Sequence, residues 1–126
     1  SYFYEFEFNL GVNVSSQSFL NIYDSSSQSI YSVELAKDWL PIGFSNNDQF
    51  MEDEVVFAGY GIVAPTFENY SAYNSYLGLD VKNKWVMVLR YLPENIPMDY
   101  KIHLSKYADL IRKAIVARDL GAKGII

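Results

Sequence analysis

The sequence predicts an α+β, mainly β domain whose sheet includes a right-handed strand–helix–strand crossover near the C-terminus. Aromatic residues make up 17% of the 126 residues, and together with the β-branched residues they favour strands. An apolar run at 85–89, a helical repeat at 105–120 and a second apolar run from 124 follow one another. This order is typical of two parallel strands joined by a helix, a connection that is almost always right-handed.

The first third of the chain contains short stretches with strand character. Residues 2–8 alternate Tyr and Phe with other side chains, the period of two expected of a half-buried strand. One or two short strands are expected within 12–23 and another at 30–33, separated by the polar loop 24–29. Residues 1–37 are therefore assigned to a β-rich lead-in segment.

The middle of the chain is expected to form a bent strand and then a short helix. The strand at 54–57 continues past Gly59 and Gly61, which permit a positive φ or a close backbone approach at a bend. Residues 68–77 can form a short helix, and Gly78 is the left-handed residue expected at its end.

A turn, a central strand and a loop are expected next. Residues 80–84 supply polar turn chemistry, and the almost wholly apolar run 85–89 predicts a strand buried on both faces. Residues 91–104 contain Pro93 and Pro97 and are expected to form a loop.

The clearest helical pattern begins after this loop. Ser105 is the expected N-cap, and Gly121 is expected to end the helix. Apolar residues recur at helical spacing: Tyr107, Leu110, Ile111, Ala114, Ala117 and Leu120. Charged residues lie mostly off that stripe: Arg112, Lys113, Arg118 and Asp119. The strand from Gly124 should pair in parallel beside 85–89, and because the sequence stops three residues into it, we expect a domain truncated at its C-terminus.

Composition and charge argue against several classes of function. The formal charge of −5 and the scattered basic residues argue against a nucleic-acid partner, which requires concentrated Lys and Arg. The absence of cysteine excludes disulfides, thiolate metal sites and cysteine nucleophiles. No apolar run approaches the length of about 18 residues typical of a membrane span.

Several motifs, taken in order, resemble one known family, the protease-associated domain in the version inserted in secreted zinc-dependent aminopeptidases. The resemblance covers residues 38–126 and is only loose over 1–37. The motifs are the lead-in at 38–45, the run VVFAGYGI at 55–62, the pair Tyr70 and Tyr73, the run GLDVKNKWVMVLR at 78–90, and the helix and strand at 107–126.

This resemblance implies a fold and a role. In the family the domain is a small open β-barrel or sandwich with flanking helices, is not catalytic, and modulates substrate access or protein contacts. The expected partners are its own catalytic domain and a peptide substrate or another protein. Zinc belongs to the catalytic domain, so no cofactor, metal ligand or catalytic residue is expected in this chain. An extracellular or periplasmic location is implied. The glycines Gly59, Gly61, Gly78 and Gly121 are interpreted as structural.

Three sharper interpretations compete with structural ones. Gly59, Gly61 and Ala64 with Asp80 mimic a dinucleotide fingerprint, but the residues around Pro65 do not predict the helix that would meet a pyrophosphate.

A metal site could involve the acidic residues 52–54 or His103. Adjacent residues of a strand alternate faces, so we expect 52–54 instead to protect the edge of a strand from association with another strand. His103 is expected in a loop or at the surface. As the single histidine, with no nucleophile-elbow motif, it makes a catalytic triad unexpected.

The many tyrosines suggest one of two arrangements. They form a recognition platform, or their rings line the core while their hydroxyls reach water at its edge. The residues concerned are Tyr60, Tyr70, Tyr73, Tyr76 and Tyr91. The loop 90–100 is the candidate interaction segment, because a proline-interrupted loop after a central strand can reach a neighbouring domain. Its candidate contact residues are Arg90, Tyr91, Glu94 and Tyr100.

Two functions remain open at this stage. The first is a non-catalytic protease-associated domain of an exported zinc aminopeptidase. The alternative is an extracellular carbohydrate- or protein-binding β module with no peptidase attached.

Overall fold

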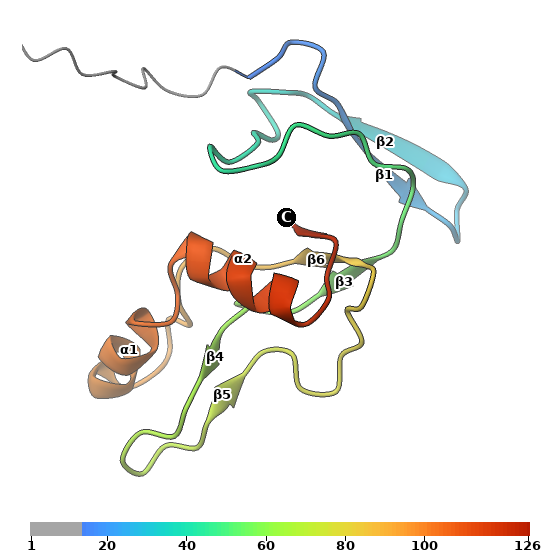
Figure 1. The fold of residues 1–126 in the computed structure, drawn as a ribbon. Helices are drawn as coiled ribbons and strands as arrows, with labels where there is room; N and C mark the ends of the chain where they lie inside the picture. Colours follow the sequence, from blue (N-terminus) through green and yellow to red (C-terminus); the bar gives the residue numbers. More distant parts are fainter. Residues whose placement is uncertain (1–13) are drawn as a thin grey trace, which may run out of the picture. The chain divides into compact units, whose positions relative to one another are not determined.

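The structure is a computed structural model that describes residues 14–126, so the strand expected at 2–8 lies outside the described part. The chain divides into two compact units, 1–49 and 50–126. The described elements, drawn in Figure 1, are β1 (Leu20–Asp24), β2 (Ser29–Val33), β3 (Val55–Phe57), β4 (Val63–Ala64), β5 (Tyr73–Asn74), β6 (Trp85–Met87), α1 (Met98–Ser105), α2 (Leu110–Asp119) and β7 (Gly124–Ile125).

In the first unit, β1 and β2 form an antiparallel hairpin that pairs Leu20 with Val33 and Asp24 with Ser29. The carboxylate of Asp24 closes the turn by accepting hydrogen bonds from the backbone N–H of Ser26 at 2.9 Å, from its hydroxyl at 2.7 Å and from the Ser27 hydroxyl at 2.8 Å. These bonds lower the pKa of Asp24 to about 2, and the bond from the Ser26 hydroxyl makes the largest contribution. The predicted strands on either side of the polar loop 24–29 are therefore confirmed.

The second unit is built around a three-stranded parallel sheet in the order β3-β6-β7. Val55 pairs with Trp85, and Trp85 pairs with Gly124 on its other side. The parallel pairing predicted for the last strand is confirmed, and α1 and α2 lie in the connection that leads to it. At the start of this sheet, Lys84 contacts Glu54 at 3.0 Å and Lys123 forms an ion pair with Asp53.

One face of this sheet packs against α2. Val86 and Ala117 are fully buried there, and Val56 packs against them, as the position of α2 beside β3 and β6 in Figure 1 shows. On the opposite face Phe57 is exposed and Met87 is 39% exposed. The prediction that 85–89 is buried on both faces is therefore wrong, although Phe50 packs edge to face on Trp85 at 5.0 Å between ring centroids.

A second hairpin, β4 with β5, replaces the helix predicted at 68–77. Backbone bonds between Phe67 and Tyr70 tighten its tip. The Asn74 side chain accepts the backbone N–H of Tyr76 at 2.9 Å, and the Ser75 hydroxyl accepts that of Ile62 at 3.0 Å. The bond of Asn74 is local and competes with a helix, and the bond of Ser75 joins this segment to the residue before β4; together they explain the wrong prediction.

The loop predicted at 91–104 is wrong over its second half, which forms α1 after Pro97. Asp99 lies in the first turn of α1, where a negative charge is favoured. Ser105 ends α1 and donates its hydroxyl to the carbonyl of Ile102 at 2.6 Å, so its predicted role as an N-cap is also wrong. Asp109 caps α2 instead, because its side chain accepts the N–H of Arg112 at 2.9 Å.

The strands of residues 14–126 form three separate small sheets that do not close into a barrel. Each strand of the second unit has only two or three residues, because a turn or a loop follows at once. The α+β class is thus observed, whereas the barrel implied by the resemblance is not formed by the described strands. No helix within 14–126 is long and apolar enough to cross a membrane.

Candidate functional site

The four glycines singled out in the sequence all have φ angles in the left-handed region: Gly59, Gly61, Gly78 and Gly121. At Gly61 the backbone also approaches its neighbours closely, because an added Cβ would lie 2.7 Å from Cγ1 of Val88. Gly78 follows the β5 turn and not a helix, which corrects the reason given for it. These residues bend the chain between packed elements, as expected of structural glycines.

Gly59 and Gly61 are followed by strand β4 (Val63–Ala64) and not by a helix. A dinucleotide fingerprint requires a helix N-terminus at this point, so its glycines here have no such element to present to a pyrophosphate. The glycine spacing therefore reflects the turn between β3 and β4.

His103 lies on α1 and is 6% exposed, so its predicted position in a loop or at the surface is wrong. Its Nε2 atom lies 3.0 Å from the carbonyl oxygen of Pro65, and its ring stacks on Phe67 at 4.6 Å between centroids. Because that carbonyl can only accept, Nε2 carries a proton in this contact. The histidine therefore joins α1 to the segment after β4.

No group of three or more His, Cys, Asp or Glu side chains within 14–126 is arranged to hold a metal ion. Asp53 and Glu54 are engaged in ion pairs with Lys123 and Lys84. They lie at the start of the edge strand β3, where charges oppose association with another strand.

Lys113 is the most unusual charged residue of the second unit, because its side chain is fully buried. Its Nζ donates to the carbonyl oxygens of Leu89 at 2.9 Å and Tyr91 at 2.8 Å, and it lies 5.9 Å from the centroid of the Tyr60 ring. Burial lowers the pKa of the amine. The predicted position of Lys113 off the buried stripe of this helix is wrong, since it lies with Ala117 on the face that packs inward.

The carbonyl groups that Lys113 binds, those of Leu89 and Tyr91, lie on either side of Arg90, the first of the predicted contact residues. Tyr91 has a φ of +69° and is 72% exposed, and the Arg90 guanidinium lies 5.3 Å from its ring centroid. Glu94 is exposed in the loop that follows. Tyr100 instead lies on α1 and stacks on Tyr70 at 4.3 Å. The structure therefore brings Arg90 and Tyr91 together and assigns Tyr100 to a different cluster.

The tyrosines do not form a single exposed platform. Tyr76 is buried with Val86, whereas Tyr60 and Tyr73 pack on a second cluster around Ile62. Tyr91 alone among the five candidates is largely exposed. Three of the five therefore belong to core clusters, but the hydroxyl of Tyr76 is buried and does not lie at a solvent-exposed rim as expected.

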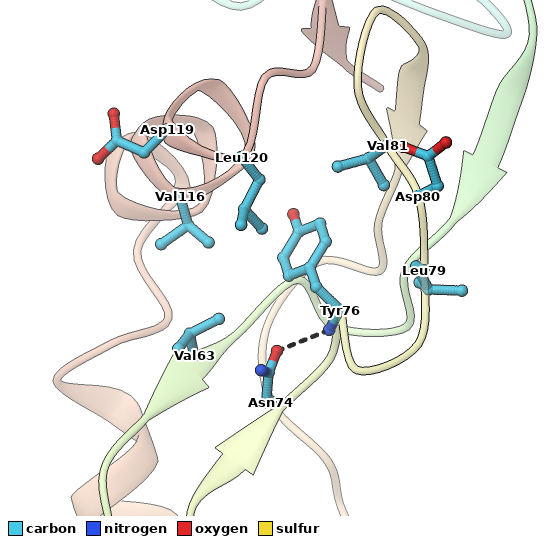
Figure 2. Close-up of a pocket in the computed structure, with 9 residues that line it drawn as sticks. All are labelled: Val63, Asn74, Tyr76, Leu79, Asp80, Val81, Val116, Asp119 and Leu120. Carbon is cyan, nitrogen blue, oxygen red and sulfur yellow. Dashed lines mark hydrogen bonds between the residues drawn. The ribbon is translucent and has the colours of Figure 1, made fainter.

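A pocket of about 360 Å³ lies between α2 and the β4–β5 hairpin, and Figure 2 shows the residues around it. This volume is within the range of about 300–1,000 Å³ found for small-molecule sites. Its apolar wall consists of Val63, Leu79, Val81, Val116 and Leu120. Its polar groups come from Asn74, Tyr76, Asp80 and Asp119.

Tyr76 lies in the middle of these residues in Figure 2 and is 5% exposed. Its hydroxyl is buried and has no hydrogen-bond partner among the described residues. An unpaired buried hydroxyl is costly, and burial raises the pKa of this phenol so that it stays neutral. The hydroxyl of Tyr76 is therefore a buried polar group of the core, close to Gly61, that has no partner among the described residues.

Comparison of the chain with protein-family models, with curated proteins and with solved structures finds no match.

The sequence did not reveal the pocket or the bonds of Lys113 and His103, because each depends on contacts between segments far apart in the chain. The available signal for α1 was Pro97 followed by Asp99, an arrangement common at helix starts. For Lys113 the signal was its spacing of four from Ala117, which puts both residues on one helix face.

Proposed function

We propose that this chain is a non-catalytic protease-associated domain of an exported zinc aminopeptidase, where it modulates the access of peptide substrates. Its partners are its own catalytic domain and the peptide, and the zinc is held by that catalytic domain. The proposed location is extracellular or periplasmic. The proposal starts from the order of the motifs in the sequence, of which the runs 55–62 and 78–90 are the most specific.

The observation that carries the proposal is the way in which Lys113 holds the Arg90–Tyr91 segment. Two charge-assisted hydrogen bonds fix the backbone on either side of Arg90, while the Tyr91 ring remains in solvent. A loop that is rigid in its backbone but exposed in its aromatic side chain suits a contact surface, because little conformational entropy is lost on binding. Tyr and Arg are also the side chains enriched at such surfaces.

The chemistry of the remaining residues agrees with a non-catalytic role. The two groups most able to take part in proton transfer, His103 and Lys113, are both buried and bound to backbone carbonyls. Neither has a hydroxyl nucleophile among its hydrogen-bond partners in the described residues.

The first test is the open reading frame around these residues and the activity of the isolated chain. We expect an adjoining segment with the His, Asp and Glu ligands of a zinc peptidase, and no release of amino acids by residues 1–126 supplied with zinc. An open reading frame that encodes no peptidase would favour the carbohydrate- or protein-binding module. Robust turnover by the isolated chain would refute a non-catalytic role.

The second test measures the full-length enzyme with Arg90→Ala and Tyr91→Gly. Glycine is chosen at 91 because it removes the ring while keeping the left-handed backbone. We expect KM for a tetrapeptide to rise by about 3- to 10-fold, as for the loss of one contact of about 1 kcal/mol, with KM for a single-residue chromogenic amide unchanged. Leu77→Ala, at a side chain 83% exposed, is the matched control. Equal effects on both substrates, or none, would contradict substrate gating by this loop.

A further inference from the structure

The three arginines of the chain differ in how their guanidinium groups are used. A terminal nitrogen of Arg112 donates to the carbonyl oxygen of Lys106 at 2.6 Å, and the guanidinium of Arg118 donates to the carboxylate of Asp119 at 2.9 and 3.0 Å. Arg90 is exposed, and its guanidinium forms neither a hydrogen bond nor an ion pair among residues 14–126. Of the three, Arg90 is therefore the cation that can engage a ligand without giving up an existing bond.

The ring of Tyr91 fixes where this cation lies. Cζ of Arg90 is 5.3 Å from the ring centroid, within the distance of about 6 Å that a cation–π contact requires. Such a contact uses no hydrogen-bond acceptor, so the five N–H donors of the guanidinium remain available to an anion. The backbone on either side is held by Lys113, whose Nζ donates to the carbonyls of Leu89 and Tyr91. The cation is therefore presented on a fixed segment, and less conformational freedom is lost when a ligand binds.

The arrangement of the N–H donors selects the class of ligand. A guanidinium can form two parallel hydrogen bonds with the oxygens of a carboxylate or of a phosphate. A phosphate monoester carries up to about two negative charges, whereas the segment 90–97 has Arg90 as its only cation and also contains Glu94. A singly charged carboxylate is the better match for this segment.

The Tyr91 ring adds a second requirement. It is 72% exposed, so the surface that Arg90 does not cover can pack against a hydrocarbon group of the ligand. A peptide offers a carboxylate beside hydrocarbon in two places, at its carboxy-terminal residue and at an acidic side chain next to an apolar one.

From these features we propose that Arg90 and Tyr91 form a binding site for a carboxylate of a peptide, with the guanidinium on the carboxylate oxygens and the phenol ring against the neighbouring hydrocarbon. The identification of this peptide as the substrate rests on the proposed function, whereas binding of the carboxylate by this chain does not.

The test titrates the 126-residue chain with acetylated tripeptides and follows the Arg90 Nε–H and the Tyr91 amide by NMR. We expect N-acetyl-alanyl-alanyl-leucine to give saturable shifts with a Kd of about 1–5 mM, in keeping with a contact made chiefly by two side chains. Its carboxy-terminal amide lacks the charge and should bind at least about 5-fold more weakly. N-acetyl-alanyl-aspartyl-leucinamide carries a carboxylate only in its side chain, so tight binding of this peptide would identify an acidic side chain as the source.

Substitutions separate the charge, the guanidinium geometry and the ring. Arg90→Gln should weaken binding of the preferred peptide by about 5-fold or more, and Arg90→Lys, which keeps the charge but loses the two parallel bonds, by about 2- to 3-fold. Tyr91→Gly keeps the left-handed backbone and should also weaken it by about 2- to 3-fold. Arg112→Gln is the matched control, because that guanidinium also lies over a tyrosine ring, at 4.9 Å from Tyr107, but already donates to a carbonyl.

Three results would overturn the proposal. The first is the absence of saturable shifts with either carboxylate peptide up to about 50 mM, a concentration at which the site should be about nine-tenths filled. The second is binding of the uncharged amide as tight as that of both acids. The third is an equal loss of binding in Arg90→Gln and Arg112→Gln, which would show a general effect of charge and no site at Arg90.

Kinetics of the full-length enzyme distinguish this inference from the proposed function. If the isolated chain binds the carboxylate peptide but Arg90→Ala leaves KM for that peptide unchanged in the enzyme, substrate gating fails and the carboxylate site stands. If Arg90→Ala raises KM equally for peptides with and without a carboxylate, the loop acts on substrates and the carboxylate site is refuted.

Discussion

The Nζ atom of Lys113 lies 2.8 Å from the carbonyl oxygen of Tyr91, so a buried cation on α2 holds a residue whose own φ is +69°. A non-glycine residue in the left-handed region is strained and persists only where its surroundings fix it. Lys113 supplies that fixation, and the carbonyl of Leu89 supplies the second acceptor.

Replacement of Lys113 by methionine keeps an unbranched apolar side chain that is one atom shorter and removes the ammonium. We expect the free energy of unfolding to fall by about 1–2 kcal/mol, because two hydrogen bonds from a charged donor are lost while the cost of burying the charge is removed. Urea unfolding followed by the fluorescence of Trp85, with Trp39 replaced by Phe in both proteins, measures this change. The N–H of Leu89 bonds to the carbonyl of Gly59 at 2.7 Å, and its hydrogen exchange should accelerate in parallel. Unchanged exchange at Leu89 would show that Lys113 does not hold the loop.

The pH dependence of stability provides an independent check on Lys113. Because burial lowers its pKa in the folded state, the unfolded chain takes up this proton first as the pH falls below 10.5. The contribution of this group to stability is therefore greatest above 10.5 and is lost as the pH falls from 10.5 to the lowered pKa. Lys113→Met should lack that component, so the stability difference between the two proteins should depend on pH in this window. A difference that is constant across the window would argue that the amine is not perturbed.

Alanine at position 124 should disrupt the pairing of β7 with β6. An added Cβ would overlap the ring of Trp85, so the strand or the indole must move. We expect a loss of about 2–4 kcal/mol and a shift in Trp85 emission. Gly78→Ala is the control, because nothing lies within 4 Å of its Cβ and only its positive φ of 76° is disfavoured, which should cost about 1 kcal/mol. A larger loss at 78 than at 124 would contradict this account of the sheet.

Two candidate caps of α2 can be compared directly. Asp109→Ala removes the side chain that accepts the Arg112 N–H and should destabilise the unit by about 0.5–2 kcal/mol. Ser105→Ala, at the residue that the sequence suggested as the cap, should cost less than about 0.5 kcal/mol, because its hydroxyl bonds only within the last turn of α1. Chemical denaturation of both variants measures the difference, and the reverse order would restore Ser105 as the cap.

The turn of the β1–β2 hairpin should respond to acid. Asp24 has a pKa lowered from 3.8 to about 2, so its contribution to hairpin stability is present above pH 3.8 and is lost as the pH falls through about 2. A ¹³C titration of its carboxyl group should give this midpoint. Ser26→Ala should move it upward toward 3.8, since that hydroxyl is the largest cause of the shift. A wild-type midpoint near 3.8 would rule out the three-bond turn.

The sequence predicted the segments whose structure depends on local chemistry. The polar turn after Asp24 and the stop at Gly121 required only neighbouring residues, and both are confirmed. The parallel strand from Gly124 followed from the order of elements. The helix predicted at 68–77 failed because tertiary contacts and side-chain bonds, such as that of Ser75 to Ile62, favoured a hairpin.

The candidate site was predicted less well than the fold, for a physical reason. Arg90 and Tyr91 are adjacent in sequence, so their pairing was open to prediction, whereas Tyr100 belongs to a helix that the proline pattern concealed. The charge on Lys113 argued for an exposed position, and only the carbonyl groups at the end of β6, distant in sequence, explain its burial.

The parallel register of the three-stranded sheet has a consequence for how the second unit folds. Val55 pairs with Trp85, and Trp85 pairs with Gly124, so a long loop of chain must close before either pair of strands can form its hydrogen bonds. The β4–β5 hairpin needs only a short loop to close. Entropy favours the early formation of such local pairs, so we expect the hairpin and the helices to appear first and the central sheet to limit the rate of folding.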